Sequence, residues 1–151
     1  MKVNYDLISR QMEALAEASY DYLPVMANAS ALINETLDDL NWAGFYLVRN
    51  DALLLGPFQG KTACVNIAKG KGVCGTAFEK DETQLIPDVH QFPGHIACDS
   101  ASNSEIVVPI HHEGKVVAVL DIDSPSFDRF SQEDKEGLEN FVKVLEKIIQ
   151  W

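Results

Sequence analysis

The sequence predicts an α+β domain in which helices cover an antiparallel sheet. Apolar residues recur at helical spacing near both ends of the chain, and runs of aromatic and β-branched residues bounded by turn residues fill the middle. At 151 residues and 46% hydrophobic, the chain suits one domain with a real core. We therefore expect a single domain over 1–151, with N-terminal helices in 1–40, the sheet, a glycine turn and an active-site loop in 41–130, and a C-terminal helix in 131–151.

The first forty residues predict two amphipathic helices. From Tyr5 to Ala18 the apolar residues repeat every three or four positions. The second helix begins near Pro24, because the first turn of a helix tolerates proline, and its apolar rhythm continues to about Leu40. These helices are expected to form packing surface and not a functional site.

The next segment predicts a β-hairpin. The run WAGFYLVR, 42–49, is rich in aromatic and branched residues, and Asn50-Asp51 marks a turn into a second strand over 52–59. Gly56 and Pro57 interrupt that second strand, which is typical of a bulge or of an edge strand.

A glycine-rich run follows a further predicted strand. Residues 62–67 have a strand-like pattern that includes Cys64, and GKGVCGTAF then places three glycines around Cys74, before a short helix over 75–80. The run lacks the GxxxxGK[ST] spacing of a phosphate-binding loop. We interpret it as a turn that brings backbone close to a ligand.

The remainder of the chain predicts a long loop, a hairpin and a helix. A short strand over 84–87 precedes a polar loop over 88–104, and loops of this length in compact domains are often functional. Strands over 105–111 and 115–121 are joined by a tight turn. The last helix, 131–150, begins with Ser131 as its cap and Asp134 three residues later.

The charge of the chain excludes several classes of partner. It has 23 acidic and 12 basic residues and a net charge of −11, so no basic field is available to attract nucleic acid or an anionic membrane. The N-terminus lacks the continuous apolar core of a signal peptide, and no run approaches the roughly 20 apolar residues of a membrane helix. A cytoplasmic protein is the expectation.

Three cysteines, Cys64, Cys74 and Cys98, indicate redox chemistry. An odd number without an export signal argues against a structural disulfide framework, and no CxxC or HxxxH pair supports zinc. His95 precedes Cys98 by three residues, but this spacing is not diagnostic of a hydrolase. A transient disulfide needs one cysteine on a rearranging segment, such as the loop of Cys98. Cys64, in a predicted strand, could equally be inert core.

Three carboxylates and two aromatic residues are candidates for the same site. Asp121 and Asp123 are two apart on a predicted strand, so their side chains should share one face. A solvated strand end would explain them equally well. Trp42 and Tyr46, four apart on another strand, should also share a face, either in the core or facing a ligand.

Four motifs of this chain resemble those of the free methionine-(R)-sulfoxide reductase family of GAF-domain enzymes. They are GKGVCGTA, QLIPDVHQFPGHIACD, NSEIVVP and VLDIDSP. The resemblance extends from about Asn41 to the C-terminal helix and includes the spacing of all three cysteines. It implies a six-stranded antiparallel sheet flanked by helices, a homodimer, and reduction of the R-sulfoxide of free methionine, not of methionine within proteins.

The resemblance also implies a role for each candidate residue. The nucleophile is Cys98, the resolving cysteine is Cys74 with Cys64 as the alternative, and thioredoxin is the expected reductant, with no metal or organic cofactor. The substrate-contacting acids are Glu105, Asp121 and Asp123, and the aromatic wall is Trp42 and Tyr46. These acids could hold the ammonium of the free amino acid or protonate the sulfoxide oxygen. A non-catalytic GAF module that senses a small molecule is the alternative.

Overall fold

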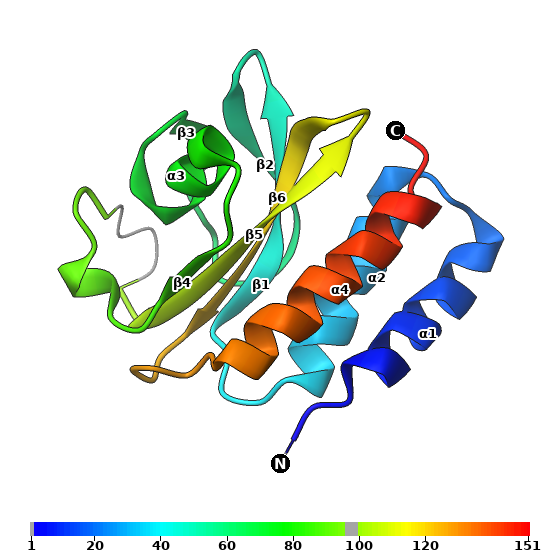
Figure 1. Cartoon of the computed structure of the whole chain (residues 1–151), viewed down its shortest axis with the longest axis horizontal. Coiled ribbons are helices and arrows are strands. Elements are labelled where there is room, and N and C mark those ends of the chain that lie inside the picture. Colours follow the sequence, from blue (N-terminus) through cyan, green and yellow to red (C-terminus); the bar gives the residue numbers. More distant parts are fainter. Residues whose placement is uncertain (1, 96–99) are drawn as a thin grey trace.

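The computed structural model describes residues 2–95 and 100–151, and its centre is an antiparallel sheet (Figure 1). The six strands of this sheet have the order β3-β2-β1-β6-β5-β4. The elements in chain order are α1 (Tyr5–Leu15), the 3-10 turn η1 (Ala16–Ala18), α2 (Tyr22–Thr36), β1 (Trp42–Arg49), β2 (Ala52–Gly60), β3 (Asn66–Ala68), α3 (Gly72–Lys80), β4 (Gln84–Ile86), the 3-10 turn η2 (Val89–Gln91), β5 (Ser104–His112), β6 (Lys115–Ser124) and α4 (Gln132–Ile148). The predicted α+β class and the six antiparallel strands are confirmed.

The helices lie on both faces of the sheet. Helices α1, α2 and α4 form one layer, whereas α3 and the segments around it lie on the opposite face (Figure 1). Three helices therefore cover one face of the sheet, and α3 covers the other. Among the described residues no helix is both long and apolar enough to cross a membrane.

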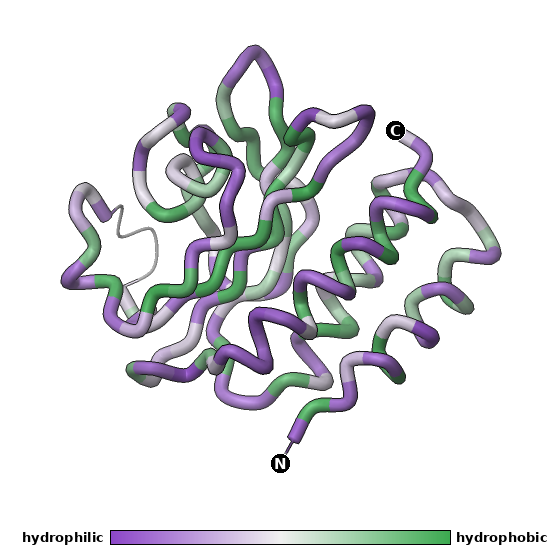
Figure 2. Tube along the Cα trace, in the orientation of Figure 1, coloured by the Kyte–Doolittle hydropathy of each residue, from purple (hydrophilic) through white to green (hydrophobic). Residues whose placement is uncertain are grey.

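Alternation along the central strands sorts side chains between these two faces. The residues of the three central strands that are buried in the core beneath the helices alternate along each strand; they are Ala43, Phe45, Leu47, Ile106, Val108, Ile110, Ala118, Leu120 and Ile122. The intervening residues face α3 and form a second, smaller cluster. Figure 2 shows hydrophobic residues concentrated in the central strands. The larger cluster forms the main hydrophobic core, and residues of the smaller cluster also line the cavity described below.

Two helix boundaries differ from the sequence prediction. α2 ends at Thr36, four residues early, because Leu37 turns into extended backbone and is buried in the core with 2% exposure. Asp38 then accepts hydrogen bonds from the Arg129 guanidinium through its backbone oxygen, at 3.0 and 3.1 Å. In the other direction, α3 starts at Gly72 and not at residue 75, so Cys74 lies inside the helix and not in a turn.

Two strand boundaries also differ. The strand predicted over 62–67 is only Asn66–Ala68, and Cys64 precedes it, because β2 pairs with β3 only over Ala52–Leu54. β6 continues to Ser124, so Asp121 and Asp123 lie within a strand paired on both sides and not at a solvated strand end.

Several local predictions are confirmed. β1 covers 42–49 as predicted. The register between β1 and β2 shifts opposite Gly56 and Pro57, as expected of a bulge. The cap of α4 is a capping box in which the Ser131 side chain accepts from the backbone N–H of Asp134, and the Asp134 carboxylate accepts from that of Ser131.

Candidate active site

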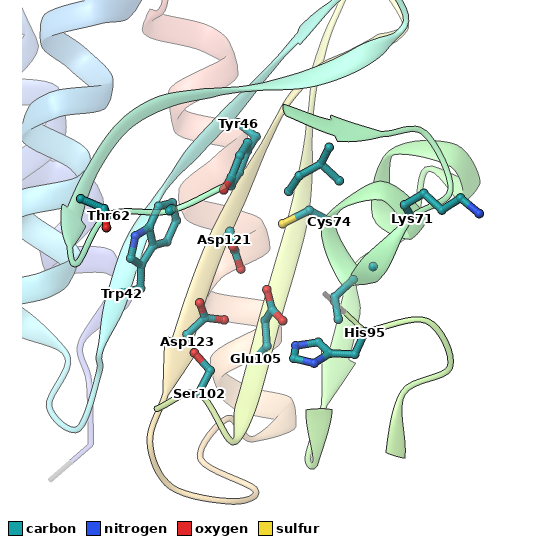
Figure 3. Close-up of a pocket in the computed structure, with 14 residues that line it drawn as sticks. Trp42, Tyr46, Thr62, Lys71, Cys74, His95, Ser102, Glu105, Asp121 and Asp123 are labelled. Atoms are coloured by element: carbon teal, nitrogen blue, oxygen red, sulfur yellow. The ribbon is translucent and has the colours of Figure 1, made fainter. Parts of the chain in front are cut away.

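The site is an acidic cavity on the face of the sheet that α3 covers. Asp123 on β6 pairs with Trp42 on β1 and with Glu105 on β5, so three strands bring these residues side by side. Asp121 follows two residues earlier on the same face. Glu105 and Asp121 are each only 6% exposed. Figure 3 shows the three carboxyl groups pointing toward one another beneath Cys74.

An aromatic wall forms one side of the cavity. The ring of Trp42 stacks on those of Tyr46 and Phe58, with centroids 5.9 and 5.1 Å apart. This stack depends on Gly44, because a Cβ there would lie 2.3 Å from the Cβ of Phe58. The predicted pairing of Trp42 and Tyr46 on one face is therefore confirmed.

The same two aromatic residues hold the segment that carries Cys64. Trp42 donates from Nε1 to the backbone oxygen of Lys61 at 3.1 Å, and the Tyr46 hydroxyl donates to the backbone oxygen of Cys64 at 2.8 Å. Cys64 is in a disulfide, whereas Cys74 is a free, buried thiol. Trp42 and Tyr46 therefore line the cavity and also hold the backbone of Lys61 and Cys64 in place.

Helix α3 brings Cys74 to the acids. Its close approach to β3 requires Gly75, because a Cβ there would lie 2.6 Å from the backbone oxygen of Ala68. As a result, the sulfur of Cys74 and carboxyl oxygens of Glu105 and Asp121 all lie within 4.8 Å of one another. Among the described residues this is the group with the geometry to hold a metal ion. The expectation that none is needed stays a prediction.

Burial and crowding raise the proton affinity of this cluster. Burial, followed by the charges of Asp121 and Asp123, raises the pKa of Glu105 well above its usual range. Burial also raises the pKa of Asp121, although hydrogen bonds from Glu105 and Cys74 oppose the increase. The pKa of the Cys74 thiol is raised well above its usual range by burial and then by the three acids. These shifts favour the protonated forms of the acids and of the Cys74 thiol in the ligand-free cavity.

One carboxyl oxygen in the cluster indicates that a cation belongs in the cavity. Oδ1 of Asp121 is buried and receives no hydrogen bond unless a neighbouring acid carries the proton. An ionised carboxylate without donors is costly to bury. A bound ammonium group would supply both donors and positive charge.

Most of the predicted site residues lie together. The cavity is lined by Trp42, Tyr46, Cys74, Glu105, Asp121 and Asp123. Cys64 adjoins it through its hydrogen bond to Tyr46, and Cys98, the predicted nucleophile, lies outside the described residues.

Sequence reasoning did not assign the other residues that line the cavity to the site. His95 and Ser102 belong to the loop that was predicted to cover a site, so the loop itself was the signal. Gly72 and Val73 belong to the glycine-rich run that was expected to bring backbone close to a ligand, so that run was a signal too. The missed residues are Thr62, Ala63, Ile67, Lys71, Gly72, Val73, His95 and Ser102.

Comparison with known proteins identifies the family. The GAF domain model matches residues 26–150. The chain is 53% identical over 145 residues to the free methionine-R-sulfoxide reductase of Escherichia coli. This alignment covers 96% of this chain and 88% of the relative. The chain belongs to the free methionine-R-sulfoxide reductase family of GAF domains. The resemblance found in the sequence motifs is confirmed.

Solved structures agree with this family assignment. The reduced form of fRMsr of Staphylococcus aureus is 52% identical, with a TM-score of 0.95 over 99% of this chain and 97% of that one. The structure of the same protein in complex with substrate is 51% identical, with a TM-score of 0.94 over 99% and 98%. The free methionine-R-sulfoxide reductase of Neisseria meningitidis in complex with its substrate is 41% identical, with a TM-score of 0.91 over 95% and 86%. This chain therefore shares its fold with two proteins that were solved in complex with their substrates.

Proposed function

We propose that this protein reduces free methionine-(R)-sulfoxide to methionine. The observation that carries the proposal is the cavity, in which Glu105 and Asp121 are buried beside an aromatic wall in a chain 53% identical to the E. coli reductase. Free methionine sulfoxide has an ammonium group, which a methionine residue within a protein lacks. The acids would bind that ammonium and so select the free amino acid.

The aromatic wall suits the other end of the substrate. Trp42 and Tyr46 present ring surface to the cavity while their polar atoms are engaged with backbone oxygens. The methyl group of the sulfoxide would therefore contact apolar ring surface, as expected for a small apolar group beside aromatic rings.

The chemistry is proposed to begin at Cys98. Its thiolate attacks the sulfoxide sulfur, the oxygen is transferred with a proton to give a sulfenic acid on Cys98, and methionine leaves. A second thiol then attacks the sulfenic sulfur, which forms a disulfide and releases water. The balance is one sulfoxide and two thiols giving methionine, one disulfide and water.

We propose Cys64 as the second thiol, although the family resemblance favoured Cys74. Cys64 is able to enter a disulfide in this fold. Burial and the acids keep Cys74 protonated, and a protonated thiol is a poor nucleophile. Cys74 would instead donate a hydrogen bond to Asp121. Thioredoxin, as a dithiol of low potential, is the proposed reductant, and a homodimer and a cytoplasmic location stay predictions.

Counting thiols tests this proposal. The fully reduced protein is incubated with the R or the S epimer of free methionine sulfoxide without reductant, and free thiols and methionine are measured. We expect two thiols to be lost and one methionine formed per chain with the R epimer. Cys98→Ser should abolish both, Cys64→Ser should yield methionine without a stable disulfide, and Cys74→Ser should still lose two thiols.

The same assay separates an enzyme from a sensor. A GAF module that only binds the sulfoxide would keep all three thiols and form no methionine. Full activity of Cys98→Ser would reject the proposed nucleophile, and loss of only the disulfide step in Cys74→Ser would return the resolving role to Cys74.

A further inference from the structure

Cys74 is a thiol of the cavity that the proposed reaction does not use. The proposed steps involve Cys98 and Cys64, whereas Cys74 is a free cysteine on α3 with 4% exposure. A buried cysteine often behaves as a small apolar residue of the core. Cys74 does belong to the smaller apolar cluster, but its sulfur lies beside carboxyl oxygens of Glu105 and Asp121. Apolar packing alone therefore does not explain this position.

The two acids next to Cys74 lack a cationic side chain that would offset their charge. Within residues 2–95 and 100–151, no lysine, arginine or histidine forms an ion pair with Glu105 or Asp121. Figure 3 shows the Lys71 side chain extending away from the acids. In the same part of the chain, the buried Oδ1 of Asp121 has no hydrogen-bond partner. A positively charged ligand is expected here, because buried charges in proteins are paired or coordinate metals.

An ammonium group accounts for the acids but not for the thiol beside them. Ammonium donates hydrogen bonds, which carboxylates accept well and a thiol sulfur accepts only weakly. A metal ion gains from both groups, because thiolate and carboxylate are both ligands of zinc. Magnesium and calcium take oxygen ligands, whereas a thiolate selects zinc. The combination of one thiol with two carboxyl groups therefore favours zinc.

The spacing of the three groups is close to that of a zinc site. Zinc lies about 2.3 Å from sulfur and about 2.0–2.2 Å from oxygen, so its ligand atoms are about 3.5 Å apart. The Cys74 sulfur and carboxyl oxygens of Glu105 and Asp121 all lie within 4.8 Å of one another, so side-chain shifts of about 1 Å would complete the site. Pairing of β5 with β6 fixes the two acids relative to each other. Three protein ligands leave the fourth position of a tetrahedral ion to water.

We propose that Cys74, Glu105 and Asp121 bind a zinc ion, and that this ion excludes the substrate from the cavity. When zinc binds, a bond forms between the metal and the Cys74 sulfur, and the thiol proton is released to solvent. No electron is transferred, so a chelator reverses the binding. Zinc takes no part in the reaction, but it competes with the substrate ammonium for the same acids. The competition rests on the proposed function, whereas the metal site does not.

Titration of a chain with a single cysteine tests the site directly. In a protein with both Cys64→Ser and Cys98→Ser, Cys74 is the one remaining cysteine. Cobalt(II) serves as the spectroscopic probe, because a cobalt–thiolate bond gives a charge-transfer band in the near ultraviolet. We expect this band to saturate at one cobalt per chain and to disappear when zinc displaces the cobalt. Absence of the band would overturn the proposal.

Substitutions in this single-cysteine protein then identify the ligands. Cys74→Ser should abolish the band and weaken zinc binding about 100-fold or more, because even loss of an outer-shell partner costs about 10- to 100-fold. Glu105→Gln and Asp121→Asn should keep the thiol but weaken zinc binding about tenfold or more. Glu136→Gln, at an exposed acid of α4, is the matched control and should leave zinc binding unchanged. Equal zinc binding by Cys74→Ser, or by both acid variants if Cys74→Ser does not fold, would overturn the proposal.

A single turnover of the protein with all three cysteines, without reductant, measures the inhibition. Zinc should slow methionine formation at low concentrations of free methionine-R-sulfoxide and much less at saturating ones, and a chelator should restore the rate. The zinc concentration for half inhibition should rise about 100-fold or more in Cys74→Ser. An unchanged concentration would place the inhibitory zinc on another thiol and overturn the proposed competition. Absence of turnover without zinc would reject the reductase, and the cobalt band would still test the metal site.

Discussion

At the scale of single residues, the cavity concentrates charge that the empty protein tolerates poorly. Glu105 and Asp121 are 6% exposed, and the pKa of each is raised by burial. Crowded acids of this kind destabilise a fold unless a ligand supplies the opposite charge. Neutralising Glu105 or Asp121 should therefore lower the activity and raise the stability of the ligand-free protein.

Glu105→Gln tests this opposition. The substitution keeps the size and removes the charge, so we expect KM for free methionine-R-sulfoxide to rise about tenfold or more, as for a lost charged hydrogen bond. The free energy of unfolding of the ligand-free protein should rise by about 1 kcal/mol at neutral pH. Kinetics and urea unfolding measure the two effects. Glu136→Gln, an exposed acid of α4, is the matched control, and a fall in both activity and stability would indicate a merely structural Glu105.

Side-chain alternation made the shared faces of the acids and of the aromatic pair predictable, whereas the position of Cys74 above the acids was not. Asp121, Asp123, Trp42 and Tyr46 follow the two-residue period of strands, so their shared face could be read from sequence. Nothing in the letters GVC says that Cys74 lies in the first turn of a helix or that its sulfur faces Glu105 and Asp121.

At the scale of elements, the errors of prediction came from contacts distant in sequence. The glycine run was expected to be a turn, yet Gly72 adopts a positive φ of 63° and begins α3. The strand predicted over 62–67 is reduced to Asn66–Ala68, and side chains of β1 instead hold Lys61 and Cys64 by their backbone oxygens. In contrast, the α4 cap was predicted well because Ser131 and Asp134 interact locally.

The contact between α1 and α4 gives a prediction at this scale. Alanine usually stabilises a helix relative to glycine, by about 1 kcal/mol. At Gly137 of α4, however, a Cβ would lie 2.1 Å from Cδ2 of Tyr5, whose hydroxyl donates to Asp134 at 2.7 Å. Gly137→Ala should therefore displace Tyr5 and reduce the free energy of unfolding by about 1–3 kcal/mol, as overpacking does.

A double-mutant cycle identifies the cause of that loss. In a Tyr5→Ala background, Gly137→Ala should become neutral or stabilising, because the ring is gone and only helix propensity remains. Urea unfolding of the four proteins measures the coupling. A stabilising effect of Gly137→Ala in the wild-type background would contradict this prediction, because it would show that the Tyr5 ring moves aside without loss of stability.

At the scale of the whole molecule, the sheet separates stability from function. The face toward α1, α2 and α4 is a continuous apolar core, and the face toward α3 combines a smaller apolar cluster with the acids. Because adjacent residues of a strand face opposite ways, a residue of the core can neighbour a residue of the site in sequence, as Ile122 does between Asp121 and Asp123. The fold class was predictable from these periods, but the placement of α3 on its own face was not, since a short helix with three glycines has a weak pattern.

One histidine connects the two layers across the sheet. His111 at the end of β5 contacts Asp81, which follows α3, through Nε2 at 2.5 Å and Glu146 of α4 through Nδ1 at 2.9 Å. Its backbone N–H also donates to Glu146 at 2.6 Å. Partial burial alone would lower the pKa of His111, but the hydrogen bonds and charges of Asp81 and Glu146 outweigh it and raise the pKa.

This connection should make stability depend on pH with a defined sign. Because the folded pKa of His111 is above the unfolded one, its contribution is complete below the ordinary value of about 6.5 and is lost as pH rises through the folded pKa. The difference in free energy of unfolding between wild type and His111→Gln should thus be largest near pH 5.5 and shrink toward pH 9, measured by urea unfolding across that range. Asp81→Asn, which removes one of the two anions, should reduce the pH dependence, and a difference that grows with pH would show that neutral His111 is the form that joins the layers.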